Sequence, residues 1–128
     1  TKTALTAALG GWKTKQPYER ITRSSEGAKK GETIKVVTPD KANAMYFAGL
    51  ILPLSDADAD YPALIIANEA FGGSGFASRL MGRIREKEGL SYGVGSAFRA
   101  ASLDPRATLS MYGIANPQNI EKVVTLAH

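Results

Sequence analysis

The sequence predicts an α+β domain with a mainly antiparallel sheet and helices packed on a face. Strand-like segments occur in two groups, residues 33–54 and 92–115, and apolar residues at helical spacing lie between them. A turn signal divides the second group, so its two halves should pair as a hairpin. A last helical pattern follows, which completes an order of strands and helices typical of this fold class.

Length and composition fit one domain spanning residues 1–128. The chain has 44% apolar residues, enough for a single core. The chain does not begin with Met, which suggests a processed or excised piece. No apolar run of about 18 residues occurs, so we expect no membrane span.

The first part of the chain should hold a helix end, a connector and two strands. Thr3–Leu9 reads as helix, and residues 13–31 are polar and irregular. Thr33–Thr38 is β-branched between Gly31 and Pro39, which predicts a strand. Asn43–Leu54 is apolar on both alternating faces, which predicts a central strand covered on both sides.

Two helices should follow. Asp60–Phe71 has apolar residues at helical spacing, with Asp60 as a plausible N-cap and Pro62 in the first turn. Ser74 can cap a second helix, which should run to about Glu88.

A hairpin and a last helix complete the predicted order. Tyr92–Ala101 and Arg106–Ala115 read as strands, joined by a turn at residues 103–105. Pro117 should open the final helix.

The run from Ser78 to Gly93 is the most informative part of the chain. Its apolar residues share one helical face, and Gly89 sits where a helix ends with positive φ. Arg85 lies in the last turns of the helix, and Tyr92 opens the next strand seven residues later. A cation and a phenol should therefore lie at the same end of two packed elements.

This run closely resembles the second, metal-free domain of pitrilysin/insulinase-type zinc metallopeptidases, a group that includes the mitochondrial processing peptidases. The resemblance covers the chain from about Trp12 to its end. The matching motifs are Trp12–Ile21, Pro39–Ala44 and the apolar stretch to Leu54, Gly72-Gly73-Ser74, Ser78-Arg79-Leu80, and Arg85, Glu88, Gly89, Leu90 and Tyr92.

The resemblance implies a metallopeptidase half-domain of the LuxS/processing-peptidase-like kind. It also implies that this chain is a fragment of the C-terminal half of a larger two-domain zinc peptidase. The expected function is that of a non-catalytic half, which completes a peptide-binding chamber and supports hydrolysis at a zinc held by a partner domain or subunit. The alternative is a degenerate structural or assembly domain of the same superfamily without peptidase activity.

Counting ligands argues against a zinc site in the chain itself. A catalytic zinc takes about three protein ligands, whereas the chain has no cysteine and a single histidine, His128. We expect His128 to be a frayed end, no metal or other cofactor in this chain, and no enzyme activity by the chain alone. The resemblance places zinc in the partner domain.

Two further motifs have simpler explanations. Asp56–Asp60 imitates the start of a calcium loop, but Tyr61 and Ala67 stand where glycine and a bidentate glutamate are needed. Residues 72–75 read as a helix–helix turn that needs unusual dihedrals. By resemblance, Gly72, Gly73 and Ser74 could instead contribute to substrate binding.

Arg85 and Tyr92 also have two interpretations. Arg85 could pair with Glu86 or Glu88, and Tyr92 could be an ordinary strand aromatic. The surrounding motif favours catalytic support in trans: both groups could orient a peptide and stabilise the charge that builds on its carbonyl oxygen.

The charge of the chain says little about partners. A formal net charge of +4 would permit nucleic-acid binding, but no aromatic ladder or binding motif accompanies the basic residues. We expect a peptide substrate and no nucleic acid. Bacterial relatives are often exported, so we expect a periplasmic or cell-envelope location.

Overall fold

A three-stranded antiparallel sheet forms the centre of the protein. The computed structural model describes residues 1–25 and 31–128. The strand order is β1 (Ala44–Leu52), β3 (Ala107–Ala115) and β2 (Ser91–Ala100), and both pairs are antiparallel. The predicted α+β class and the β2–β3 hairpin are confirmed.

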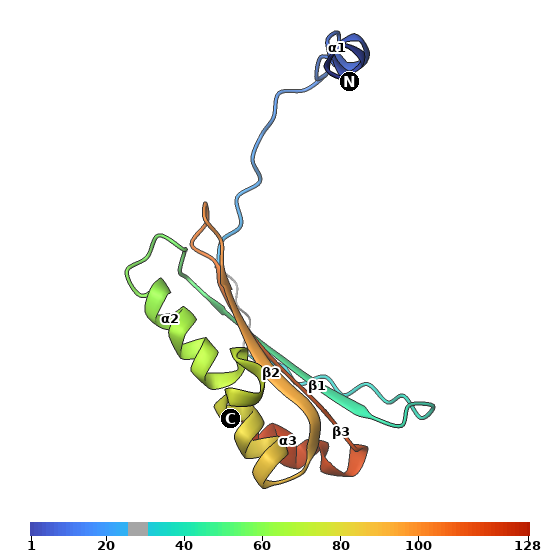
Figure 1. Cartoon of the computed structure of the whole chain (residues 1–128), viewed down its shortest axis with the longest axis vertical. Coiled ribbons are helices and arrows are strands. Elements are labelled where there is room, and N and C mark those ends of the chain that lie inside the picture. The colour runs from blue at the N-terminus through green and yellow to red at the C-terminus, as the bar shows by residue number, and fades with distance from the viewer. Residues whose placement is uncertain (26–30) are drawn as a thin grey trace.

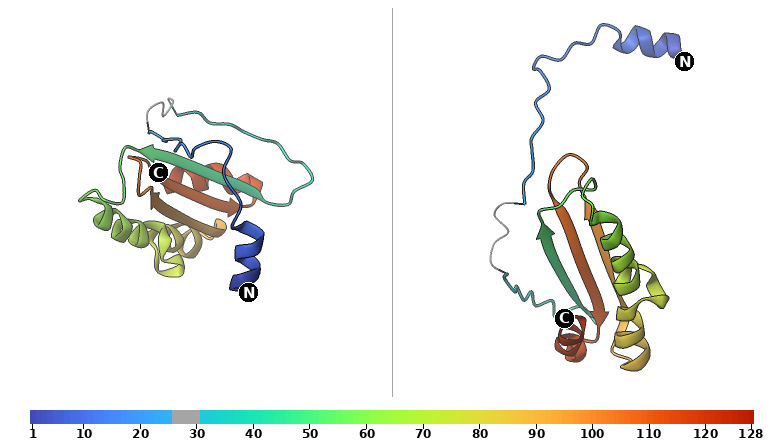
Figure 2. Two further views of the ribbon diagram at one scale, coloured as in Figure 1. Left: turned by 90° about the horizontal axis from the view of Figure 1, so that it is seen from above. Right: turned by 90° about the vertical axis from the view of Figure 1, so that its left-hand side faces the viewer.

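Helical segments pack on one face of this sheet. α2 runs alongside β2, and α3 lies at the end of the sheet where β1 and β2 begin and β3 ends (Figures 1 and 2). The segments after β1 are α2 (Tyr61–Asn68), the π-helical η1 (Glu69–Gly73), the 3₁₀ turn η2 (Gly75–Ala77), the π-helical η3 (Met81–Lys87), the 3₁₀ turn η4 (Pro117–Asn119) and α3 (Ile120–Ala127).

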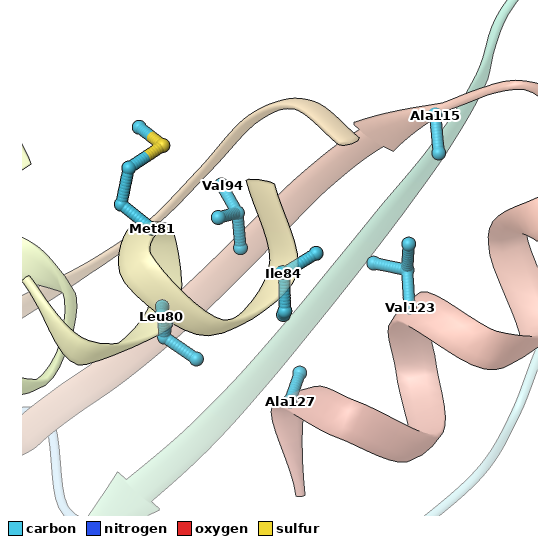
Figure 3. Close-up of a cluster of buried hydrophobic side chains, with 7 residues drawn as sticks. All are labelled: Leu80, Met81, Ile84, Val94, Ala115, Val123 and Ala127. Atoms are coloured by element: carbon cyan, nitrogen blue, oxygen red, sulfur yellow. The ribbon is translucent and has the colours of Figure 1, made fainter. Parts of the chain in front are cut away.

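The core lies where η3 and α3 meet the sheet. Ile84 of η3 and Val123 of α3 are fully buried, and Figure 3 shows these two side chains pointing toward each other on one face of the sheet. A Cβ at Gly113 of β3 would lie 2.9 Å from Val123 Cγ1, so α3 rests directly on the strand. The buried cluster is Leu80, Met81, Ile84, Val94, Ala115, Val123 and Ala127, which confirms the predicted apolar face of the helix before Gly89.

The predicted strand Thr33–Thr38 is wrong. These residues form no strand, and Ile34, Val36 and Val37 are exposed. A strand requires a neighbour that accepts and donates its backbone hydrogen bonds. No such neighbour lies beside the segment in the described part of the chain, so β-branched composition alone does not make it a strand.

The expectation of a central strand covered on both sides is also wrong. The segment does form a strand, β1, but β3 occupies the centre of the sheet. Met45 and Phe47 of β1 are exposed on the face without helices, whereas Tyr46 packs against the core. One face of β1 therefore carries apolar side chains that the described part of the chain does not cover.

The helix after the glycine-rich turn starts later than predicted. Ser74 does not cap it; its hydroxyl donates to the Glu69 carbonyl at 2.7 Å. Ser78 is extended, and its hydroxyl accepts from the Met81 N–H at 3.4 Å, so Ser78 is the residue that caps this helix. Asp60 does occupy the N-cap of α2, but its side chain makes no capping hydrogen bond.

The first helix stands apart from the sheet. α1 (Lys2–Leu9) buries no residue and connects to the rest through an extended arm (Figure 1). The arm is held at the tip of the β2–β3 hairpin. Arg106 Nη1 donates to the Ser24 carbonyl at 3.0 Å, and Arg20 pairs with Asp104 at 2.5 Å. The hydrogen bond from Arg20 holds the pKa of the Asp104 carboxyl below its usual range.

Replacing Ile84 by Ala should destabilise the protein by about 2–5 kcal/mol, because the deletion leaves a cavity in the fully buried centre of the core. Chemical unfolding of both proteins measures the difference. Ile66→Ala is the matched control: Ile66 is 70% exposed, so its loss should change the free energy of unfolding by less than about 0.5 kcal/mol. Equal effects at the two positions would contradict the assigned core.

Replacing Gly72 by Ala should cost about 1–3 kcal/mol of stability through overpacking. The added Cβ would lie 2.6 Å from the backbone nitrogen of Ser96 in β2, which cannot move away as a side chain can. Gly49→Ala provides the control, since a Cβ there meets nothing within 4 Å. Thermal unfolding should show a lower Tm for Gly72→Ala only; an unchanged Tm would mean that η1 does not pack tightly on β2.

Candidate functional site

Arg85 lies in the last turn of η3, at the end of the sheet where β2 begins. The next turn is closed by Gly89, whose φ is 63°. Its N–H donates to the Arg85 carbonyl at 3.0 Å, and the Leu90 N–H donates to the Ile84 carbonyl at 3.0 Å. Such paired bonds around a left-handed glycine end a helix and fix the direction of the following chain. The path from Arg85 into β2 is therefore set by the backbone.

Tyr92 is the extra residue of a β-bulge. Ser91 pairs with Ala115 and Gly93 pairs with Ile114, so two steps along β2 match one step along β3. The Ser91 hydroxyl lies 2.7 Å from the Ile114 carbonyl oxygen and anchors the strand at this point. Bulges re-aim a side chain and recur beside active sites.

The side chain of Tyr92 does not serve the core. It is 82% exposed, and its hydroxyl has no hydrogen-bond partner among the residues that the structure describes. An ordinary strand aromatic would pack against cross-strand neighbours. The structure therefore leaves the phenol of Tyr92 on the surface.

The neighbouring carboxylates do not neutralise Arg85. Glu88 accepts from Lys122 Nζ of α3 at 2.8 Å, and this hydrogen bond holds the pKa of the Glu88 carboxyl below its usual range. Within residues 1–25 and 31–128, Arg85 forms no salt bridge with Glu86 or any other acid. The alternative that Arg85 serves as half of a helical ion pair has no support in this geometry.

An aromatic ring is the partner of Arg85 instead. The guanidinium carbon lies 4.8 Å from the ring centroid of Phe76 in η2. Phe76 was not predicted as a site residue from the sequence. The signal available was a large apolar residue inside a loop of glycine, serine and alanine.

We use the name Arg–Tyr lip for three residues, Phe76, Arg85 and Tyr92. Arg85 lies in the last turn of η3 and Tyr92 is the second residue of β2. These two elements pack together, so both predicted residues lie at one end of the sheet. Arg85 is partly buried and Tyr92 is exposed. Neither group is sealed in the interior. A joint role of the two groups stays a prediction.

The glycine-rich turn lies at the junction of η1, η2 and β2. Gly72 is buried against Ser96, and a Cβ at Gly73 would meet Asn68 Nδ2 at 2.7 Å. Both glycines thus permit close packing. Gly73 and Ser74 are also exposed, so they can be reached from solvent, whereas Gly72 cannot. A contribution of these three residues to substrate binding stays a prediction.

The described part of the chain was expected to hold no metal, and His128 to be a frayed end. No group of three or more His, Cys, Asp or Glu side chains that could hold a metal ion occurs among the described residues. His128 instead places Nε2 3.0 Å from Tyr46 Oη and so joins the end of α3 to β1.

The acidic run before α2 stabilises turns. Asp58 Oδ2 accepts from both the N–H and the hydroxyl of Ser55 at 2.7 Å. Asp56 Oδ2 accepts from the Ser102 hydroxyl at 2.6 Å. These carboxylates therefore accept hydrogen bonds from serines of the same turn and of the β2–β3 hairpin.

The basic residues of the sequence do not gather on the sheet. Lys13 and Lys15 lie on the extended arm, and Arg20 is paired with Asp104. Lys29 and Lys30 lie outside the described residues. Over the residues described, no helix has the length and apolar character required to cross a membrane.

Comparison with known proteins identifies the family. The profile of the family described as peptidase M16 inactive domain matches residues 2–128. No curated protein matches the chain. Among solved structures, the chain is similar to the peptidase M16 inactive domain from Pseudomonas fluorescens, with 30% sequence identity and a TM-score of 0.58 over 68% of the present chain. The chain spans about 20% of the length of that protein. With a profile that matches nearly its whole length and a shared fold, the chain belongs to the peptidase M16 inactive-domain family.

Proposed function

We propose that this chain is the non-catalytic half of a zinc metallopeptidase, which completes the peptide-binding chamber and supports hydrolysis at a zinc held by a partner domain or subunit. The observation that carries the proposal is the Arg–Tyr lip. A guanidinium without a carboxylate partner in the described chain and an exposed phenol lie at one end of the domain.

The chemistry of the two groups suits a peptide carbonyl. Arg85 carries fixed N–H donors and a permanent charge, and the Tyr92 hydroxyl is a single donor. Hydrolysis places negative charge on the carbonyl oxygen of the bond that is cut. Donors that are already aimed at that position bind the charged oxygen more strongly than the neutral carbonyl, which lowers the barrier. The chain would thus contribute electrostatic stabilisation and orientation of the peptide.

The backbone supports this role by fixing the main-chain positions from which both side chains start. Arg85 is held by the closed turn at Gly89, and Tyr92 by the bulge at Ser91. A catalytic donor must keep its position to within a fraction of an ångström, and regular elements meet this demand better than loops. Gly73 and Ser74, which reach the surface beside these elements, are our weaker candidates for contact with the peptide.

Arg85→Ala and Tyr92→Phe test the proposal in the full-length protein, assayed together with its zinc-binding domain on a fluorogenic peptide. Loss of one such donor should lower kcat by about 100-fold to 1000-fold, with zinc content unchanged. Arg83→Ala and Tyr18→Phe are the matched controls, because both residues are exposed and lie outside the lip; they should retain turnover.

Three results would contradict the proposal. Unchanged kcat/KM in both lip variants would remove the supporting role. A full-length protein without peptidase activity would favour the alternative of an assembly domain. A loss of zinc in Arg85→Ala would show that the residue acts on the metal site and not on the peptide.

A further inference from the structure

We infer that Phe76 is a positioning residue for Arg85: its ring holds the guanidinium at the lip while the N–H groups of Arg85 stay available for a peptide carbonyl. This inference rests on the proposed function of Arg85. The observation that supports the inference is the distance of 4.8 Å between the Arg85 guanidinium carbon and the Phe76 ring centroid. Cations within about 6 Å of a ring centroid are attracted by the negative face of the ring.

The turn that contains Phe76 is fixed by a left-handed glycine and a buried serine. Gly75 has a φ of 60°, which turns the chain immediately before Phe76. Ser78 is only 3% exposed; its hydroxyl donates to the Gly75 carbonyl at 2.6 Å and accepts from the Met81 N–H at 3.4 Å. One buried hydroxyl therefore ties the Phe76 turn to the first turn of the helix that carries Arg85.

The exposure of Phe76 has no explanation in core packing. The side chain is 69% exposed and belongs neither to the buried cluster nor to the residues packed against it. A large apolar side chain on the surface gains little from burial, whereas a ring beside a cation gains electrostatic attraction. The contact with Arg85 is the interaction that the described structure assigns to this ring.

Whether Arg85 contacts a ring or a carboxylate decides whether its N–H groups can bind a peptide carbonyl. A carboxylate would use the N–H groups of Arg85 and cancel its charge. A ring face restricts the rotamers of the arginine but accepts none of its in-plane N–H bonds. Phe76 therefore fixes Arg85 without making it unavailable to a substrate oxygen.

A set of variants in the full-length protein, with its zinc-binding domain present, tests the inference. Phe76→Leu keeps apolar bulk but removes the ring face, and should lower kcat/KM by about three-fold to ten-fold, mainly through kcat. Phe76→Tyr and Phe76→Trp retain a ring face and should stay within about two-fold of the natural protein. Phe47→Leu is the matched control: Phe47 is 68% exposed on β1 and should tolerate the change.

The double variant Arg85→Ala/Phe76→Leu separates this inference from the proposed function. If Phe76 acts through Arg85, the second substitution should cause no further loss of kcat/KM in the Arg85→Ala background. Three results would overturn the inference and leave the role of Arg85 intact. Phe76→Leu could lower kcat/KM equally in both backgrounds, Phe76→Trp could lower kcat/KM as much as Phe76→Leu does, or Phe76→Leu could have no effect. An unchanged kcat/KM in Arg85→Ala would refute the proposed function itself.

Discussion

The turn that ends η3 and starts β2 is the constraint on which the rest of the site depends. Gly89 adopts a left-handed conformation that other residues resist, and its hydrogen bonds fix where the helix stops. Ile84 stands one residue before Arg85 and is fully buried at the centre of the core. The same packing that stabilises the domain therefore determines where the guanidinium lies.

The distribution of charge completes the site. Lys122 reaches from α3 to Glu88 and pairs with the carboxylate three residues after Arg85. An exposed ion pair of this kind adds little stability. Its consequence for chemistry is larger, because among the described residues Arg85 has an aromatic neighbour and no carboxylate partner. The packing of α3 on β3 thus influences the electrostatics of the lip.

Most of the fold could be predicted because helix faces, helix ends and hairpin turns depend on residues that are close together in the sequence. The apolar face of η3, the glycine stop and the β2–β3 hairpin follow from spacing and turn chemistry, and all three are found. Thr33–Thr38 was predicted wrongly because a strand depends on a partner elsewhere in space, which composition does not reveal. The cap at Ser78 was missed because Ser74 and Ser78 lie four residues apart in the same stretch before the helix, and only the folded chain shows which hydroxyl reaches a helix N–H.

The candidate site was predictable only in part for the same reason. Arg85 and Tyr92 could be selected from the motif, but the bulge that turns Tyr92 outward depends on the register between β2 and β3. The contact with Phe76 depends on the dihedral angles of Gly75, which the sequence does not specify. The pairing of Glu88 with Lys122 joins the C-cap of η3 to α3, which lies far along the chain.

The most direct test of the central claim is a structure of the full-length protein with a bound peptide analogue. In this analogue a zinc-binding group replaces the scissile amide. The account predicts that an Arg85 guanidinium nitrogen and Tyr92 Oη both lie within about 3.2 Å of the oxygen that replaces the scissile carbonyl. An Arg85 that pairs with a carboxylate of the partner domain, or a Tyr92 that faces away from the bound peptide, would contradict it.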